Sequence, residues 1–453
     1  MSRLVNDAGR PTRPRLSVLG ALVWYALSYG GSVLGYLAIN AFAARLLDDS
    51  FGYFVVAIST ATALGQLGLI GAHRGGLREA ARLETGDVEG LRDLRRGVRA
   101  VSRVTLPVTS LLTAAVTFGV MNDSDPAYRG LVAVLTGILV WFGGQQKLWA
   151  SYSRGFGNVR LASLLEGRSG GALVSLCQGV LVGVCLMFVP ELGLPGALAA
   201  MALGFALPVF IAKRRVARVW RGVRAEGSVL ADVRLVVSRH WRFAVNMLGT
   251  SVNGAADVWV AGVVLTGSGV ALFGAAQRLS LLLVIPLAAV GVIFSPVISR
   301  LYGKDDPNLE RLLRTGASLA AAATAVLWLP MLLLPGPLLA AIYGDFFRDA
   351  APLLLLLTLG SVSNVLTGMC GIALTMSRHE AVVAKVQVFS AAVRVGAGFV
   401  AAWQFGAVGL AVCTATISTV SSFTLWVLAR RRMGLSTHLT LRPAFTLMRR
   451  TEG

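Results

Sequence analysis

The chain has 453 residues, of which 55% are hydrophobic and 14% are charged, and its mean hydropathy is +0.70. Soluble domains are about 45–50% apolar and about 25% charged, so this composition excludes a water-soluble enzyme. The formal net charge is +20, with 42 Lys and Arg against 22 Asp and Glu, so the placement of the basic residues relative to the apolar segments becomes informative.

Apolar runs recur along the whole chain. Each is long enough, at about 1.5 Å per residue, to cross or nearly cross about 30 Å of hydrocarbon. The sequence therefore predicts an all-α polytopic membrane protein with about twelve transmembrane helices. We expect these helices near residues 17–44, 51–72, 104–121, 130–149, 169–189, 196–212, 243–265, 270–298, 315–335, 351–375, 382–403 and 406–429.

Positive charge gathers on alternate connections between these helices. With the N-terminus inside, 37 of the 42 Lys and Arg fall on inner segments, three (Arg45, Arg129 and Arg348) fall on outer segments, and two lie within spans. Because Lys and Arg on short loops set topology, we expect a multi-pass inner (plasma) membrane protein with cytoplasmic N- and C-termini. The basic surface favours anionic membrane lipids as partners, and its lack of interleaved aromatics argues against nucleic acid.

The predicted helices divide into two sets of six. We expect a basic cytoplasmic tail at 1–16, an N-terminal six-helix bundle at 17–212, a basic cytoplasmic linker at 213–242, a C-terminal six-helix bundle at 243–429 and a second basic tail at 430–453. The Arg, Glu and Ala of the linker indicate amphipathic helices at the membrane surface, and a solvated linker is the alternative. The arrangement is typical of transporters that hold a cavity between two bundles.

A weak internal match supports two equivalent halves. With an offset of 219 residues, Leu46, Gly52, Phe54 and Ala57 fall on Leu265, Ala271, Phe273 and Ala276. Each set lies at the outer turn that joins the first two helices of its half. An even number of spans in each half predicts a parallel pseudo-repeat, with its axis along the membrane normal.

Signatures of catalysis and metal binding are missing from the sequence. It contains no GxxxxGK[ST] loop, no HExxH and no convincing nucleophile elbow. The four cysteines fall inside apolar runs, and the four histidines lack the spacing of metal ligands. We therefore expect a secondary transporter with no catalytic residue, metal or cofactor, driven by an H⁺ or Na⁺ gradient or by consumption of its product.

Three charged residues fall within predicted spans: Asp257, Arg278 and Arg394. Each lies about nine or ten residues from an outer turn, which places all three roughly 13 Å below the outer surface at 1.5 Å per residue. A charge at the centre of a bilayer costs at least about 2.5–3.5 kcal/mol on insertion scales, so these residues require an explanation. The neutral polar residues Asn246, Asn253 and Gln277 lie nearby in the sequence.

Two interpretations of these charges remain open. In one, an Asp257–Arg278 ion pair fixes two helices together, and Arg394 reaches the interface or backbone carbonyls. In the other, Arg278 and Arg394 line a central cavity and bind an anionic substrate group, while Asp257 orients one of them. Arginine suits this role because its planar fork binds phosphate oxygens through two hydrogen bonds and stays ionised. The surplus of positive charge favours a phosphate-bearing substrate over a cation.

Further polar residues lie near the ends of spans, where structural or interfacial roles are the more common. We assign them to that class rather than to the substrate site. They are Asn40, Arg45, Gln66, His73, Gln145, Gln146, Lys147, Glu166 and Arg168.

Three segments carry a family resemblance. They are "AFAARLLDDSFGYFVVAISTATALGQLGLIGAHRG" near the N-terminus, "VWVAGVVLTGSGVALFGAAQRLSLLLVIPLAAV" at the start of the second half, and "LLAAIYGDFFRDAAPLLLLLTLG" at 338–360. Together they resemble the polysaccharide-biosynthesis (Wzx-like) flippases of the multidrug/oligosaccharidyl-lipid/polysaccharide (MOP) exporter superfamily. Their order and spacing agree over nearly the whole chain.

The resemblance implies a MATE/MOP-like fold of two bundles and transport by alternating access. It implies that an undecaprenyl-pyrophosphate-linked oligosaccharide moves from the inner to the outer leaflet for cell-surface polysaccharide synthesis, with polysaccharide polymerase or export machinery as possible partners. Cationic cavity residues are typical of that family, and Arg278 and Arg394 are the candidates in this chain. The lipid II flippases of the superfamily usually have two further helices and more arginines in the first bundle, so that branch fits less well.

Two alternatives remain. A multidrug or small-cation exporter of the same superfamily would require a net acidic cavity, which the surplus of arginine disfavours. A membrane-embedded polymerase or ligase would need a substantial outer loop with catalytic residues, and the longest outer connection, around 335–350, is short.

Overall fold

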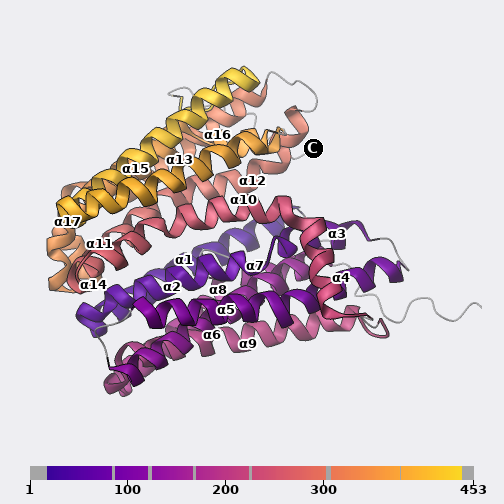
Figure 1. The fold of residues 1–453 in the computed structure, drawn as a ribbon. Coiled ribbons are helices and arrows are strands. Elements are labelled where there is room, and N and C mark those ends of the chain that lie inside the picture. The colour runs from indigo at the N-terminus through magenta and orange to yellow at the C-terminus, as the bar shows by residue number, and fades with distance from the viewer. Residues whose placement is uncertain are drawn as a thin grey trace, which may run out of the picture.

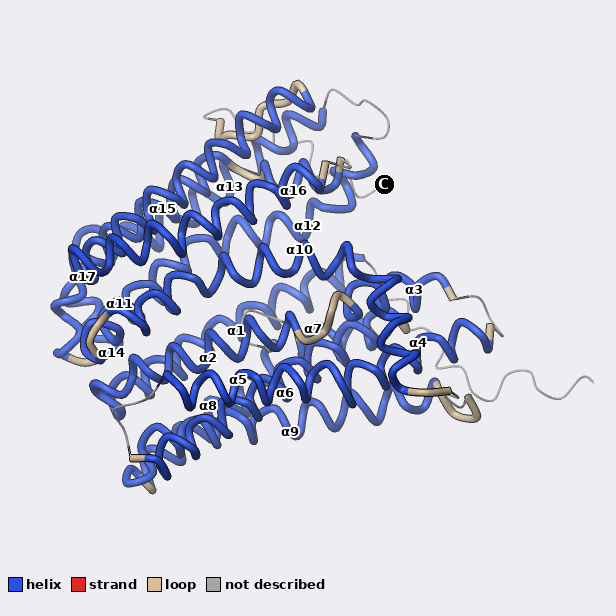
Figure 2. Tube along the Cα trace, in the orientation of Figure 1, coloured by secondary structure: helices blue, strands red, loops and turns tan. Residues whose placement is uncertain are grey.

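The computed structural model describes residues 18–83, 87–120, 125–166, 170–223, 227–302, 308–377 and 379–440. Within these ranges the chain folds into helices joined by short loops, and no strand occurs (Figure 2). The predicted tail at 1–16 and the last part of the tail at 430–453 lie outside the described residues. The described part therefore has the all-α architecture that the hydropathy pattern predicts.

The first half contains every helix that the sequence predicts there. Its long helices are α1 (Val18–Leu47), α2 (Phe51–Leu67), α5 (Leu106–Val120), α6 (Pro126–Gly155), α8 (Gly171–Phe188) and α9 (Gly193–Val219). Three shorter helices lie in the Lys- and Arg-rich connections, at the end of the molecule that we call the basic end. They are α3 (Ala72–Arg82), α4 (Val88–Ala100) and α7 (Val159–Leu165). A π-helical turn at Val101–Thr105 joins α4 to α5.

The second half begins with the long helix α10. Its helices are α10 (Val229–Val264), α11 (Gly267–Ser280), α12 (Ile285–Tyr302), α13 (Asn308–Leu333), α14 (Pro335–Tyr343), α15 (Ala351–Thr367), α16 (Cys370–Met376) and α17 (Glu380–Met433). Helix α17 is interrupted at Gly406, whose φ of 60° is the left-handed conformation that favours glycine. Its two arms correspond to the predicted spans 382–403 and 406–429.

By length and composition, nine helices in the described ranges could cross a membrane, or ten if α2 and α3, bent by 51°, form one broken span. The count treats α17 as one helix, although Gly406 divides it in two. Ten of the twelve predicted spans fall mainly on one helix or on one arm of α17, whereas 270–298 covers α11 and α12, and 351–375 covers α15 and α16. The chain is therefore a multi-pass membrane protein whose helices lie in the predicted stretches.

The predicted basic linker at 213–242 is mostly helical. Helix α9 continues to Val219, and α10 begins at Val229, so only a short connection separates them. The side chain of Ser228 caps α10 by accepting a hydrogen bond from the Ala231 backbone, and Asp232 lies in the favourable first turn. The side chain of Asp232 is fully buried against α4, where it pairs with Arg96 and Arg99. This anchors the start of α10 to the first half.

Helices of each half pack mainly against one another (Figure 1). In the first half, α1 packs on α8, α5 on α6, and α9 on both α6 and α8. In the second, α17 packs on α10, α15 and α16, and α12 packs on α13. Contacts between the halves run chiefly through α2, which meets α10 and α11. Arg278 and the other cavity residues described below lie at this junction.

The junction follows the predicted repeat. Val55 and Gly274 are 219 residues apart, and a Cβ on Gly274 would lie 3.1 Å from the nearest Val55 methyl carbon. The matched pair Gly52 and Ala271 also meet, because a Cβ on Gly52 would lie 2.9 Å from the Ala271 nitrogen. Equivalent positions touch one another only close to an axis that relates the halves. The local geometry is therefore that of a two-fold pseudo-repeat.

One end of this junction is closed by aromatic side chains. Phe51, Phe54, Tyr343 and Phe347 are almost fully buried, and the Phe51 ring lies 5.5 Å from the Phe347 ring in an edge-on arrangement. Arg45 adds hydrogen bonds to the backbone carbonyls of α14. We call this end, formed by the turn between α1 and α2 together with α11 and α14, the closed end.

We expect Gly52→Val to destabilise the closed end. A side chain there would meet the Gly267 carbonyl and the Ala271 nitrogen at less than 3 Å, and overpacking of this kind typically costs about 1–3 kcal/mol. The thermal midpoint of the purified protein in detergent should fall. The matched control is Gly119→Val, because no atom lies within 4 Å of the position a Cβ would take there. Equal midpoints for the two variants would contradict the described packing.

Candidate functional site

A cavity of about 370 Å³ lies between the halves. Helices α1, α2, α3, α6 and α9 of the first half and α10 and α11 of the second contribute to it, and its closed-end boundary includes Phe54. Its polar lining, among the described residues, consists of Tyr36, Asn40, Ser59, Thr62, Gln66, Arg74, Thr250, Ser251, Gln277 and Arg278. This described lining contains two arginines and no carboxylate. The volume falls within the range of small-molecule sites.

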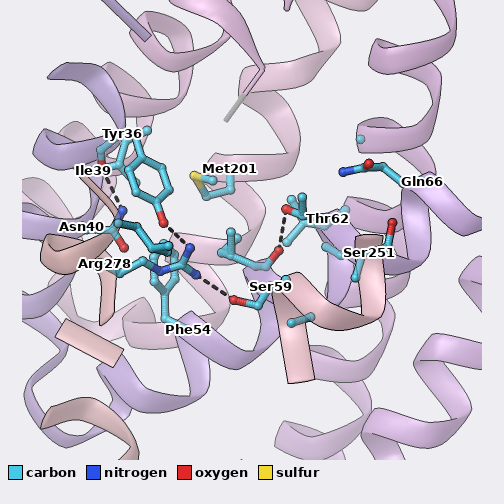
Figure 3. A pocket seen from close by; sticks show the side chains of 18 of the residues that line it. Tyr36, Ile39, Asn40, Phe54, Ser59, Thr62, Gln66, Met201, Ser251 and Arg278 are labelled. Carbon is cyan, nitrogen blue, oxygen red and sulfur yellow. Dashed lines mark hydrogen bonds between the residues drawn. The ribbon is translucent and has the colours of Figure 1, made fainter. Parts of the chain in front are cut away.

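Arg278 connects the two halves at this cavity (Figure 3). From α11 its guanidinium donates to the Tyr36 hydroxyl on α1, to the Ser59 hydroxyl on α2 at 2.8 Å, and to the Val55 carbonyl at 3.3 Å. Ser59 and Arg278 are themselves 219 residues apart, so they occupy equivalent positions of the two halves. The named partners are all uncharged oxygens, and no carboxylate of the described residues forms an ion pair with Arg278.

Arg394 lies elsewhere. On α17, at 6% exposure, its guanidinium donates to the Asp257 carboxylate on α10 at 2.6 Å and to the Ser418 hydroxyl at 2.9 Å. Asp257 is 4% exposed. Neither Asp257 nor Arg394 belongs to the described lining of the cavity. The expectation that Arg278 and Arg394 share one cavity is therefore wrong, as is the alternative Asp257–Arg278 ion pair.

The error has a geometric cause. Sequence spacing fixes the depth of a side chain in the membrane, but not the direction in which it points around the helix axis. Helix α17 packs on α10 and α15, within the second half, so Arg394 meets Asp257 there instead of reaching the junction with the first half. Residues at one depth consequently serve two separate polar clusters.

The neutral candidates also separate. Gln277 lines the cavity and flanks the Asp257 carboxylate, so it lies between the cavity and the ion pair. Asn253 donates to the Gln387 side chain on α17 at 2.8 Å and is not part of the described cavity lining. The side chain of Asn246 lies outside the described residues. Of the five predicted site residues whose side chains are described, Arg278 and Gln277 line the cavity.

Sequence reasoning missed a second group of residues. A neighbouring cavity, also of about 370 Å³, is lined by several residues that we assigned to interfaces. They include Gln66, His73, Gln146, Lys147 and Glu166. Arg74 and Arg154, which belong to the Lys and Arg of the predicted inner segments, line this cavity as well. The polar run Gln145-Gln146-Lys147 was the available signal, because α6 continues through it to Gly155 and keeps these side chains within the bundle.

We expect Asp257→Asn to destabilise the protein strongly. It would leave the Arg394 guanidinium buried without its counter-charge, and breaking a buried ion pair in this way costs about 3–5 kcal/mol. Unfolding in detergent, followed by tryptophan fluorescence, measures the change. The double variant Asp257→Leu/Arg394→Met removes both charges and should recover much of the loss. Arg348→Gln, at an exposed ion pair with Asp345, is the control and should change little. A mild effect of Asp257→Asn would refute the buried pair.

No protein-family model and no curated protein matches the chain. Solved structures do. The lipid II flippase MurJ, in an inward closed conformation, matches with a TM-score of 0.71 at 13% identity, over 90% of this chain and 87% of that one. A multidrug resistance MATE family transporter of the MOP superfamily matches in its inward-facing conformation with a TM-score of 0.62 at 18% identity, covering 91% and 94%.

The outward-facing conformation of a multidrug resistance MATE family transporter gives a TM-score of 0.58 at 19% identity, over 92% of this chain and 96% of that one. At these identities the similarity establishes the fold. The predicted MATE/MOP-like architecture is confirmed, while the Wzx-like subfamily remains a prediction. The chain therefore has the fold that MATE transporters of the MOP superfamily and the lipid II flippase MurJ share.

Proposed function

We propose that this protein is a flippase that moves an undecaprenyl-pyrophosphate-linked oligosaccharide from the inner to the outer leaflet by alternating access, for cell-surface polysaccharide synthesis. The observation that carries the proposal is the cavity between the halves, whose described lining contains Arg74 and Arg278 and no carboxylate. A positive site enclosed by apolar helices favours an anionic group on a lipid-anchored substrate.

Arg278 is the residue best suited to bind the pyrophosphate. Its guanidinium currently donates to the neutral oxygens of Tyr36, Ser59 and Val55. Phosphate oxygens form stronger, charge-assisted hydrogen bonds and can replace a hydroxyl partner. The arginine also remains charged at any physiological pH, so it is always ready to bind an anion. Arg394 is assigned a structural role in its ion pair with Asp257.

The cavity is closed at one end, which suits entry of the substrate from the other. Aromatic residues shut the closed end, and the cavity lies between them and the basic end of the molecule, which the charge distribution predicts to be cytoplasmic. The substrate would enter from the inner leaflet, and the closed-end contacts would open to release it outside. An H⁺ or Na⁺ gradient, or consumption of the product by a polymerase or export system, would drive the cycle.

The alternatives fit the cavity less well. A multidrug exporter of cations would place its substrate beside Arg278 without an acidic lining residue, which is electrostatically unfavourable. A polymerase or ligase would need catalytic groups on an outer loop. The predicted outer connection near 335–350 instead folds into α14 and a 3₁₀ turn at Asp345–Ala350, whose Phe347 packs on Phe51.

Deletion of this protein in its host tests the function. Mass analysis of membrane lipids should then show a polyprenyl-pyrophosphate-linked oligosaccharide accumulating on the cytoplasmic leaflet. The deletion strain carrying the wild-type chain is the reference. An unchanged lipid-linked pool together with normal surface polysaccharide would exclude the proposal.

We expect Arg278→Ala to abolish transport while the protein is still made and inserted. Loss of a bidentate, charge-assisted hydrogen-bonding contact removes at least about 1.5–3 kcal/mol of binding free energy, which is roughly tenfold or more in affinity. Complementation of the deletion strain, with membrane levels checked by immunoblot, measures the effect. Arg278→Lys keeps the charge but not the fork and should transport at an intermediate rate. Arg215→Gln, on the exposed end of α9, is the matched control. Full complementation by Arg278→Ala would rule out this role.

A further inference from the structure

The second cavity lies next to the first, towards the basic end of the molecule. Its described lining comes largely from α2, α3 and α6, with Glu166 and Gly170 from the connection between α7 and α8. Arg74 on α3, Lys147 and Arg154 on α6, and one carboxylate, Glu166, are its charged residues. We propose that this cavity is a separate diphosphate-binding site, which, resting on the proposed function, receives the substrate's pyrophosphate before Arg278 does.

Lys147 is the strongest element of this site. It lies on α6 with its side chain partly buried among helices, and in the described chain its ammonium group makes no hydrogen bond and no ion pair within 4 Å. Glu166 lines the same cavity and attracts this ammonium, but the two form no ion pair within 4 Å. An ammonium removed from bulk water without a contacting counter-ion is costly. An anion in the cavity would supply the missing partner.

Arg74 and Arg154 complete the positive lining. Arg74 likewise forms no ion pair in the described part of the chain, although it borders both cavities. Arg154 pairs with Glu166, whose carboxylate also attracts Lys147. In the described lining, three cations therefore face one carboxylate, and this excess of positive charge suits a group with two or more negative charges.

A neutral polar atom points to the same ligand class. His73 is 4% exposed and lines this cavity, and its Nδ1 has no hydrogen-bond partner among the described residues. Buried polar atoms without a protein partner are uncommon and normally bind water or a ligand. Gln146, by contrast, is already engaged, since its side-chain amide donates to the Leu165 carbonyl. The unsatisfied groups of this cavity are thus hydrogen-bond donors or can become donors, as an anion requires.

The two cavities share enough residues to form one route. Thr62, Gln66 and Arg74 belong to the lining of both. A diphosphate at Lys147 and Arg154 would next meet Arg74 and then Arg278. Spacing the positive charges along the route lets each site release the anion to the next, whereas a single strong site would retain it. The charge of the cavity at the basic end is therefore part of the transport route and not only a signal for topology.

Calorimetric titration of inorganic pyrophosphate into the full-length protein in phosphatidylcholine nanodiscs tests this site. We expect wild-type protein to bind at two sites. Lys147→Gln should weaken one of them about tenfold or more, and Glu166→Gln should tighten that same site, because the competing carboxylate is gone. Lys213→Gln, an exposed lysine on α9, is the matched control. A gain in affinity from Glu166→Gln cannot result from misfolding.

Unchanged pyrophosphate binding in both Lys147→Gln and Glu166→Gln would overturn the proposal. Arg278→Ala should remove only the other site, so loss of transport in that variant and loss of binding at Lys147 are distinguishable. A second titration in nanodiscs that contain a polyprenyl diphosphate identifies the source of the ligand. Competition at the Lys147-dependent site supports the lipid carrier, and its absence overturns the link to the lipid while the diphosphate site stands.

Discussion

A charged side chain among apolar helices must be either paired or hydrated, and this constraint organises the polar interior of the protein. Asp257 and Arg394 satisfy it by neutralising each other between α10 and α17. Arg278 has no such carboxylate among the described residues and instead faces the cavity between the halves, held by neutral oxygens of α1 and α2. A charge that is paired, like that of Arg394, stabilises one bundle. A charge that faces a cavity, like that of Arg278, is available to bind a substrate.

The repeat explains why this cavity lies where it does. Positions 219 residues apart meet at the junction: Val55 approaches Gly274, and Ser59 accepts a hydrogen bond from Arg278. Small residues at the contact let the helices approach closely at the closed end. One half thus contributes a serine, and the other an arginine, at equivalent positions. The backbones of the two halves are equivalent at this point but the side chains differ, so the positive charge of Arg278 comes from the second half alone.

Much of the fold was predictable because hydrophobicity is a property of each segment. Most predicted spans coincide with one helix, although 270–298 and 351–375 each cover two. The division of α17 at Gly406 coincides with the boundary placed between the last two spans. The segment at 213–242 shows where that reasoning stops. Its composition indicates an amphipathic helix, but the buried contacts of Asp232 with Arg96 and Arg99 on α4, more than 130 positions away, are decided by the tertiary structure.

The sequence by itself determined that the chain is a membrane protein, where its helices lie, and which charges require a partner. The tertiary structure alone decided which partner each charge has. Depth along a helix follows from residue counting at about 1.5 Å per residue. The direction of a side chain around that helix depends on which neighbours the helix packs against. This direction places Arg394 in an ion pair and Arg278 at the cavity between the halves. It also places Lys147 and Arg74 at the neighbouring cavity.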